Sequence, residues 1–292
     1  MENNIPRIAY KKSENLRIEV MNFAELQKKL KQVDMDHDPF SVHKIEFYLI
    51  LVVTKNSYTH FVDFKSYQLQ SGSAIFIAKN QIHHFSEELL NTEGYCIIFS
   101  SLFTENLHTV SNKFKIHRLF NYHIEIPVIH QNEMGKDSLI SIGQKLYYEF
   151  QFPNNFGKKE ILRSLLQVLF LKAERAKNLR TINDVNPFWL ETFSAFKNLL
   201  HQDYTKTRSS KDYASKLFIS YKLLNDIIKK LSGKTAKAFI DNFVTMEIKR
   251  LLAASSLSIK EISYKTGFEE PSNLVKFFKK NTNITPLKFR QQ

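Results

Sequence analysis

Cysteine, glycine, proline and tryptophan are all scarce in this 292-residue chain, which has one Cys, seven Gly, seven Pro and one Trp. Cys96 alone cannot form an intramolecular disulfide or a multi-thiolate metal site, which favours a reducing compartment. No window approaches the roughly 18 uninterrupted apolar residues that span a bilayer, and the amino terminus lacks the apolar segment of a signal peptide. We therefore expect a cytoplasmic protein with no membrane partner.

Hydrophobic residues make up 43% of the chain and aromatic residues 13%, which suffices for buried cores and excludes global disorder and fibrous proteins. At roughly 100–200 residues per domain, the length predicts two domains. Residues 185–292 hold 19 Lys plus Arg against 9 Asp plus Glu, whereas residues 1–184 hold 23 against 20. A near-neutral first part and a basic second part indicate that the second part binds a polyanion.

The first part of the chain reads as short strands. β-Branched and aromatic residues with turn signals at about ten-residue spacing occur in 45–53, 59–64, 67–78 and 94–100, which predicts an antiparallel barrel or sandwich. Helical periodicity begins at residue 136 and continues to residue 175. Residues 158–175 are apolar on more than one face, which fits either an ordinary core helix or a dimer contact.

The fold class that we expect is a two-domain α+β protein, with an antiparallel β-barrel and trailing helices followed by an all-α domain. The predicted segments are 1–135 as the barrel, 136–176 as helices on the barrel and probable dimer contact, 177–187 as a linker, and 188–292 as the helical domain.

Two short helix pairs in the second part have the pattern of a helix-turn-helix, which needs a small residue at the helix crossing, a tight turn and an apolar anchor. Each pair alone is a weak signal. Two such pairs joined by one basic helix, 233–255, are a much stronger one. The two triplets are Ala214, Phe218 and Leu224, and Ser263, Gly267 and Leu274.

Residues 193–290 resemble the DNA-binding domain of AraC/XylS-type bacterial transcription regulators. The resemblance rests mainly on SIKEISYKTGF at 258–268 and PSNLVKFFKKNTNITPLKFR at 271–290. Two residues depart from the family pattern. Asn283 stands where the family usually has glycine, and Phe218 occupies a turn where glycine is common. Because asparagine tolerates a left-handed backbone, we expect the turn at 283 to be kept.

The resemblance implies two recognition helices, and helical periodicity separates their exposed residues from buried ones. We expect Asn225 to read adenine and the lysines to meet guanine or phosphate, with Lys276 favouring phosphate. The candidate DNA contacts are Ser220, Tyr221, Lys222, Asn225 and Lys229 in the first unit, and Ser272, Asn273, Lys276 and Lys279 in the second. Lys237, Lys249 and Arg250 on the connecting helix are candidates for phosphate contact or for ordinary solvation.

The strand pattern resembles the cupin-like regulatory domain that is common in this family. Of the metal ligands that ordinary cupins carry, His43 and His83 are kept, while Ile45 and Leu49 replace two others. Two imidazoles are too few for a catalytic metal site, so we expect no metal and no cofactor. The barrel either holds a small effector or is filled by its own side chains. The candidate effector-pocket residues are His43, His83, Phe47, Phe61 and Phe76.

These patterns predict a sequence-specific DNA-binding transcription regulator that is dimeric and not an enzyme. Its expected partners are a double-stranded DNA operator, a second copy of the chain and a small-molecule effector, with RNA polymerase as a further candidate. Two alternatives stay open: a regulator that needs no ligand, and a degenerate cupin enzyme fused to a DNA-binding domain.

Overall fold

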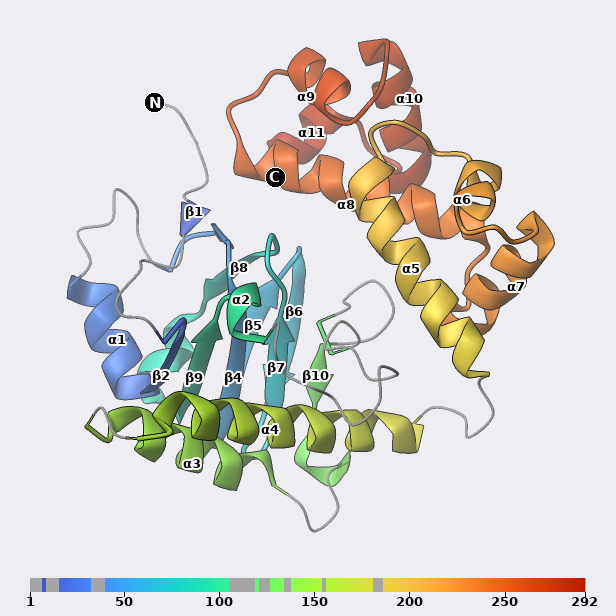
Figure 1. The fold of residues 1–292 in the computed structure, drawn as a ribbon. Helices are drawn as coiled ribbons and strands as arrows, with labels where there is room; N and C mark the ends of the chain where they lie inside the picture. Colours follow the sequence, from blue (N-terminus) through green and yellow to red (C-terminus); the bar gives the residue numbers. More distant parts are fainter. Residues whose placement is uncertain are drawn as a thin grey trace. The chain divides into compact units, whose positions relative to one another are not determined.

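The computed structural model describes residues 7–8, 16–32, 40–104, 119–120, 127–133, 138–153, 156–180 and 186–291. These residues form two compact units. The amino-terminal unit comprises the described residues up to 180, and the carboxy-terminal unit comprises those from 186 onward. Figure 1 shows strands with helices in the first unit and helices alone in the second.

The amino-terminal unit contains two five-stranded sheets among its described residues. Sheet A has the strand order β1-β3-β8-β5-β6, and sheet B has the order β10-β7-β4-β9-β2. All neighbouring strands are antiparallel except β1 and β3. The strands are β1 (Arg7–Ile8), β2 (Ile18–Asn22), β3 (His43–Ile45), β4 (Tyr48–Lys55), β5 (Tyr58–Val62), β6 (Lys65–Leu69), β7 (Ala74–Ile77), β8 (Ile82–Phe85), β9 (Glu93–Phe99) and β10 (Val128–Ile129).

Strand β4 explains the uninterrupted apolar run in the sequence. It lies at the centre of sheet B, and both of its faces are buried. Ile50 and Val52 belong to a core that includes residues of two helices, whereas Leu49 and Leu51 belong to a second core that includes residues of both sheets. A strand that is buried on both faces has no polar alternation, which is why the sequence reads as apolar throughout.

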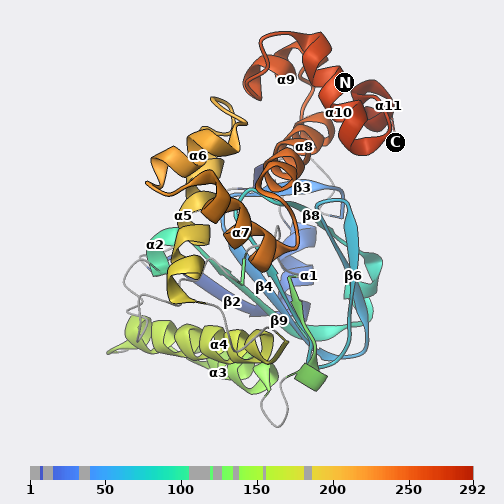
Figure 2. The ribbon, with the colours of Figure 1, turned by 90° about the vertical axis from the view of Figure 1, so that its right-hand side faces the viewer.

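Two long helices, α3 (Leu139–Gln151) and α4 (Lys158–Arg180), pack on sheet B. They run side by side in both views of the fold (Figures 1 and 2). Leu162 and Leu166 of α4 and Leu146 of α3 are fully buried in the core that these helices share with the sheet. The remaining short elements of this unit are α1 (Phe23–Gln32), η1 (Glu87–Asn91), α2 (Ser101–Thr104) and η2 (Gln131–Glu133).

The carboxy-terminal unit has seven helices around one core, in the part of the chain from Asn186 to Gln291. Helix α8 makes contact with α6 and α7, which form the first helix pair, and with α9 and α10, which form the second (Figure 1). The helices are α5 (Pro187–Asp203), α6 (Ser210–Lys216), α7 (Tyr221–Ser232), α8 (Ala236–Ala254), α9 (Ile259–Lys265), α10 (Pro271–Thr282) and α11 (Pro286–Arg290).

Side-chain caps fix where these helices begin. Ser220 accepts a hydrogen bond from the Leu223 N–H at the start of α7, and Ser258 forms a reciprocal capping box with Glu261 at the start of α9. Helix α10 ends at Asn283, whose φ of 64° is left-handed, as the sequence predicted. Phe218 also adopts a left-handed φ, 56°, in the turn between α6 and α7.

The strands of the first unit and the helices of the second confirm the predicted two-domain α+β layout. Helix α4 continues to Arg180, within the predicted linker 177–187; residues 181–185 lie outside the described ranges, and α5 begins at Pro187. None of the helices described is both long enough and apolar enough to cross a bilayer.

Candidate functional site

The amino-terminal unit places three histidines together on the inner face of sheet A. His43 of β3 and His83 of β8 are directly paired across the sheet, with ring centroids 4.2 Å apart. His60 of β5 joins them, because its Nε2 lies 3.2 Å from Nδ1 of His83. The Tyr58 hydroxyl lies 2.7 Å from Nδ1 of His60, and all three imidazoles are buried. We call His43, His60 and His83 the histidine cluster.

Burial sets the electrostatics of this cluster. Loss of hydration lowers the pKa of His60 and of His83 well below the usual histidine value, and the neighbouring imidazoles lower both further. His83 Nε2 is buried without a hydrogen-bond partner among the described residues. His60 and His83 are therefore neutral polar groups inside an apolar unit, and one ring nitrogen of His83 is unsatisfied.

The structure brings together only part of the predicted effector set. His43 and His83 lie side by side, but His60, which the cupin comparison did not point to, lies between Tyr58 and His83. The alternation of β5 could have found it, since Tyr58, His60 and Val62 share a face. Phe47 is buried in the core that contains inner residues of sheet A.

Phe61 and Phe76 require correction as pocket residues. Phe61 alternates to the opposite face of β5 and stacks on His84, with ring centroids 4.3 Å apart. Phe76 is fully buried in the core beneath α3 and α4 and packs against Phe120. Neither side chain lines a common interior with the histidine cluster. Among the residues that the structure describes, no group of three or more His, Cys, Asp or Glu side chains has a metal-binding arrangement.

In the carboxy-terminal unit, α7 exposes a basic face. Leu224, Ile227 and Ile228 are buried in the core, and the opposite side of the helix points to solvent. The exposed residues are Tyr221, Lys222, Asp226, Lys229 and Lys230. Three of the four predicted contacts after Ser220 are therefore exposed, and Lys230 and Asp226 are additions that the sequence reasoning missed although helical spacing places them beside Lys222 and Lys229.

Asn225 and Ser220 are engaged locally. The Asn225 side-chain oxygen accepts a 3.0 Å hydrogen bond from the Ala236 N–H, which ties α7 to the first turn of α8. Bidentate reading of adenine needs that oxygen as well as the amide nitrogen. We therefore remove Asn225 from the base-reading candidates. The Ser220 hydroxyl oxygen caps α7 and remains exposed.

Helix α10 repeats this arrangement. Leu274 and Phe278 are buried, and the helix begins at Pro271, directly after the capping position Glu270. The predicted contacts Ser272, Asn273, Lys276 and Lys279 are all exposed, and Lys280 joins them. Each of the two helices thus exposes three lysines beside short polar side chains. Such a surface offers phosphate contacts from the lysines and hydrogen bonds to base edges from Asn273 and Ser272.

Comparison with known proteins decides the nature of this unit. Residues 213–292 match a protein-family model described as a helix-turn-helix domain, a span that contains α7, α8, α9 and α10 entirely. The carboxy-terminal unit is an AraC-type helix-turn-helix domain. The predicted resemblance at 193–290 is thereby confirmed.

Relatives of this chain are named as HTH-type transcription regulators. The chain is 22% identical over 265 residues to the HTH-type transcriptional activator RhaS of Escherichia coli O81 (strain ED1a), covering 86% of this chain and 88% of RhaS. It is 21% identical to the uncharacterized regulator YtdP of Bacillus subtilis (strain 168), covering 67% of this chain but spanning only 24% of YtdP. A crystal structure of ToxT from Vibrio cholerae superposes with a TM-score of 0.46 at 16% identity, covering 94% of this chain and 97% of ToxT.

The cationic side chains of the connecting helix, α8, have other surroundings than the lysines exposed on α7 and α10. Lys237 forms an ion pair with Asp241 at 2.6 Å, and the Lys249 ammonium lies 5.4 Å from the centre of the Phe289 ring. Arg250 needs correction as a phosphate candidate, because its side chain is buried and ion-paired with Glu247. A guanidinium buried in this way cannot reach a phosphate.

Proposed function

We propose that this protein is a sequence-specific DNA-binding transcription regulator in which α7 and α10 enter successive major-groove segments on one face of the DNA. The observation that carries this proposal is the match of residues 213–292 to a helix-turn-helix domain family, in a unit whose helices α7 and α10 both expose a lysine-rich face. Helix α8 packs against both helix pairs and so holds them in one body.

The exposed side chains divide into two proposed roles. Lys222, Lys229, Lys276 and Lys279 neutralise phosphates and supply affinity, because an ammonium on a flexible stem acts as a point charge. Base reading falls to side chains that carry both a donor and an acceptor, and Asn273 on α10 is the strongest of them. Its side chain is exposed at the start of the helix, where recognition helices approach base edges.

The amino-terminal unit is proposed to control this DNA binding through an effector. The support is the histidine cluster, in which His83 Nε2 is buried without a hydrogen-bond partner among the described residues. A bound ligand would supply the missing hydrogen bond, as donor or as acceptor. The effector would be a small molecule with a hydroxyl or carbonyl group. RhaS is named a transcriptional activator, so activation with RNA polymerase as partner is the proposed mode of action.

Dimerisation is the second proposed role of the amino-terminal unit. Helix α4 buries Leu162 and Leu166 against sheet B while Ile161, Val168 and Leu171 remain exposed along the rest of its surface. An apolar stripe on a helix that already has one buried face favours contact with a second copy. Two copies would place two AraC-type domains on one operator.

The experiment that tests the regulator is selection of bound genomic fragments by the purified protein at several salt concentrations. A shared motif with two segments supports sequence-specific regulation, and the neighbouring genes suggest effectors. Uniform binding that falls steeply with salt would contradict it, because counterion release alone then explains the affinity.

A regulator without an effector is favoured by one observation. His60 packs against both Tyr58 and Phe85 in sheet A, with His60 and Phe85 ring centroids 5.4 Å apart, so side chains fill this part of the interior. A thermal-shift panel of small hydroxylated and carbonyl-bearing metabolites separates the two possibilities. A response confined to the amino-terminal transition supports the effector, and a flat response across the panel supports the ligand-independent regulator.

A further inference from the structure

The two helix-turn-helix units touch each other directly, in addition to sharing α8. Both contacting segments lie in the carboxy-terminal unit. The loop between α5 and α6 belongs to the first helix-turn-helix, and the turn after α9 belongs to the second helix-turn-helix. Gly267 in that turn lies so close to the loop that a Cβ placed on it would be 1.8 Å from the Thr205 carbonyl oxygen. Its φ of 77° is also left-handed. Only glycine allows this approach of the two backbones.

Arg208 completes the contact from the loop side. Its Nη2 donates a 2.8 Å hydrogen bond to the Gly267 carbonyl oxygen, and its guanidinium carbon lies 3.6 Å from the centre of the Phe268 ring. One side chain of the first unit thus holds both a backbone carbonyl and an aromatic face of the second. A planar guanidinium suits this double contact, because it stacks on the ring while its edge donates hydrogen bonds.

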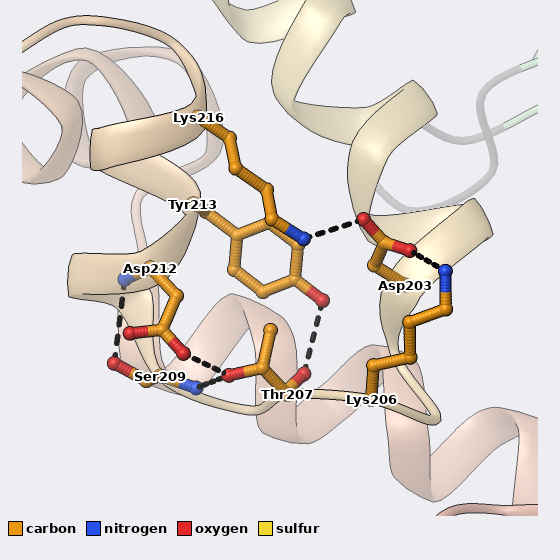
Figure 3. A network of polar contacts seen from close by, with 7 residues as sticks. All are labelled: Asp203, Lys206, Thr207, Ser209, Asp212, Tyr213 and Lys216. Carbon is orange, nitrogen blue, oxygen red and sulfur yellow. Dashed lines mark hydrogen bonds and ion pairs between the residues drawn. The ribbon is translucent and has the colours of Figure 1, made fainter.

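A network of polar contacts fixes the loop that carries Arg208 (Figure 3). Asp203, at the end of α5, is ion-paired with Lys206 and with Lys216 of α6, each at 2.7 Å, and these two hydrogen bonds lower the pKa of its carboxyl. The Tyr213 hydroxyl donates to the Thr207 carbonyl oxygen at 3.0 Å. These contacts hold the loop to α5 on one side and to α6 on the other. A movement of the first helix-turn-helix is therefore passed to Arg208.

The other side of the contact is equally anchored. Phe268 is buried, and its ring packs against Phe277 of α10, the second recognition helix, with centroids 5.3 Å apart. The Ser263 hydroxyl donates to the Phe268 carbonyl oxygen at 3.3 Å. A chain of contacts therefore runs from α6 through Arg208 and Phe268 to α10, independently of the connecting helix.

We propose that Arg208 is a positioning residue that sets the distance and rotation between the two recognition helices, and thereby the spacing between the two DNA segments that one chain reads. This inference rests on the proposed DNA-binding function. Two linked binding elements gain affinity only when their geometry matches that of the two sites. Without the Arg208 contact, only α8 and the close approach of the Gly267 and Thr205 backbones hold the two helix-turn-helix segments, and the domain tolerates a wider range of spacings.

The test compares operators that differ only in the spacing of their two segments. The operator found by selection is prepared with its natural spacing, with one inserted base pair, which rotates the segments by about 35°, and with one segment scrambled. Full-length Arg208→Leu keeps apolar contact with Phe268 and loses the hydrogen bond to Gly267. Lys211→Ala removes a positive charge from an exposed position three residues away and serves as the matched charge control.

For the unmodified protein we expect the inserted base pair to weaken binding strongly. Arg208→Leu should weaken binding at the natural spacing by about tenfold and shrink the penalty of the insertion at least about fivefold, with little change on the scrambled operator. Arg208→Lys should lie nearer to Arg208→Leu than to the unmodified protein, because an ammonium cannot stack and donate in the same way. Lys211→Ala should lower all three affinities alike.

Three results would overturn the inference. One is an insertion penalty in Arg208→Leu equal to that of the unmodified protein. Another is an equal loss on all operators, as for the charge control. The third is failure of both Arg208 variants to fold, as seen by thermal unfolding, which would make Arg208 a folding residue. If the unmodified protein itself binds all DNA alike, the proposed function fails instead, and that result is distinct from these three.

Discussion

The two units of this protein place their ionisable side chains in opposite environments. The amino-terminal unit buries three imidazoles on the inner face of a sheet, where the cost of charging keeps His60 and His83 neutral. The carboxy-terminal unit holds its apolar residues inside and exposes three lysines on each of α7 and α10. We expect the first arrangement to respond to a ligand in the interior or to pH, and the second to respond to a polyanion at the surface. Each of the following changes probes one side of this contrast.

The largest effect should come from a charge inside α4. Leu166 is fully buried against sheet B, so Leu166→Glu places a carboxylate in an apolar core and should destabilise the amino-terminal unit by more than ~4 kcal/mol. Leu166 therefore cannot serve as a test of dimerisation. Circular dichroism should show loss of the strand-containing unit.

Val168→Glu is the matched change two residues along. Val168 is 41% exposed, so the fold should survive while the proposed dimer contact is lost. Light scattering should then report the mass of one chain for Val168→Glu and of two for the unmodified protein. An unchanged mass for Val168→Glu would rule out this face of α4 as the dimer contact.

Acidification should destabilise the amino-terminal unit selectively. In the folded state the pKa of His60 and of His83 lies well below the unfolded value of about 6.5, so below that pH the unfolded chain binds more protons. Stability is fully present above pH 6.5 and falls as the pH drops, by up to about 2.7 kcal/mol per pH unit for two such histidines. Thermal unfolding between pH 7 and pH 5 measures this slope.

Two comparisons sharpen the pH experiment. His83→Leu removes one of the two titrating groups and should roughly halve the slope, whatever it does to stability at neutral pH. The single tryptophan, Trp189, packs on the core of the carboxy-terminal unit, so its fluorescence follows that unit separately. An equal loss of stability in both units, or an unchanged slope in His83→Leu, would show that the acid sensitivity does not come from the histidine cluster.

The sequence predicted the helical unit more completely than the sheet unit. Caps and turns at Ser220, Ser258 and Asn283 are local signals that can be read directly, and the apolar spacing of α7 and α10 gives their exposed faces. The strands of the sheet unit were visible, but their pairing depends on residues far apart in the chain. The register that places His43 opposite His83 is of this kind.

The errors in the candidate sites have the same origin. Phe61 and Phe76 are aromatic residues on predicted strands, and composition alone does not say which face of which sheet they occupy. Arg250 lies in a basic helix, and only the packing of α8 shows that its guanidinium points inward to Glu247. The exposed lysines were predictable because a helix with one apolar face leaves the other to solvent.

A smaller effect tests the exposed lysines themselves. Lys276 on α10 is exposed and proposed to contact phosphate, so Lys276→Ala should weaken binding to all sequences several-fold and lower the salt slope by about one unit. Lys237→Ala, on the connecting helix, is the control, because Lys237 is already paired with Asp241 at 2.6 Å. Binding titrations over a range of salt concentrations measure both. A loss limited to particular base positions would assign Lys276 to base reading.

The smallest expected effect is a gain in stability at Phe218. This residue adopts a left-handed φ of 56° although its side chain is 95% exposed, so the unit bears backbone strain that no buried contact of the ring offsets. Phe218→Gly should relieve the strain, and after the added freedom of the unfolded chain the net gain should be about 0.5–1 kcal/mol. Asn283→Gly, at a φ of 64°, is the control with a smaller gain, because asparagine accepts this backbone readily. Urea unfolding followed by Trp189 fluorescence measures both changes, and a destabilised Phe218→Gly would mean that the ring makes a contact that holds the turn.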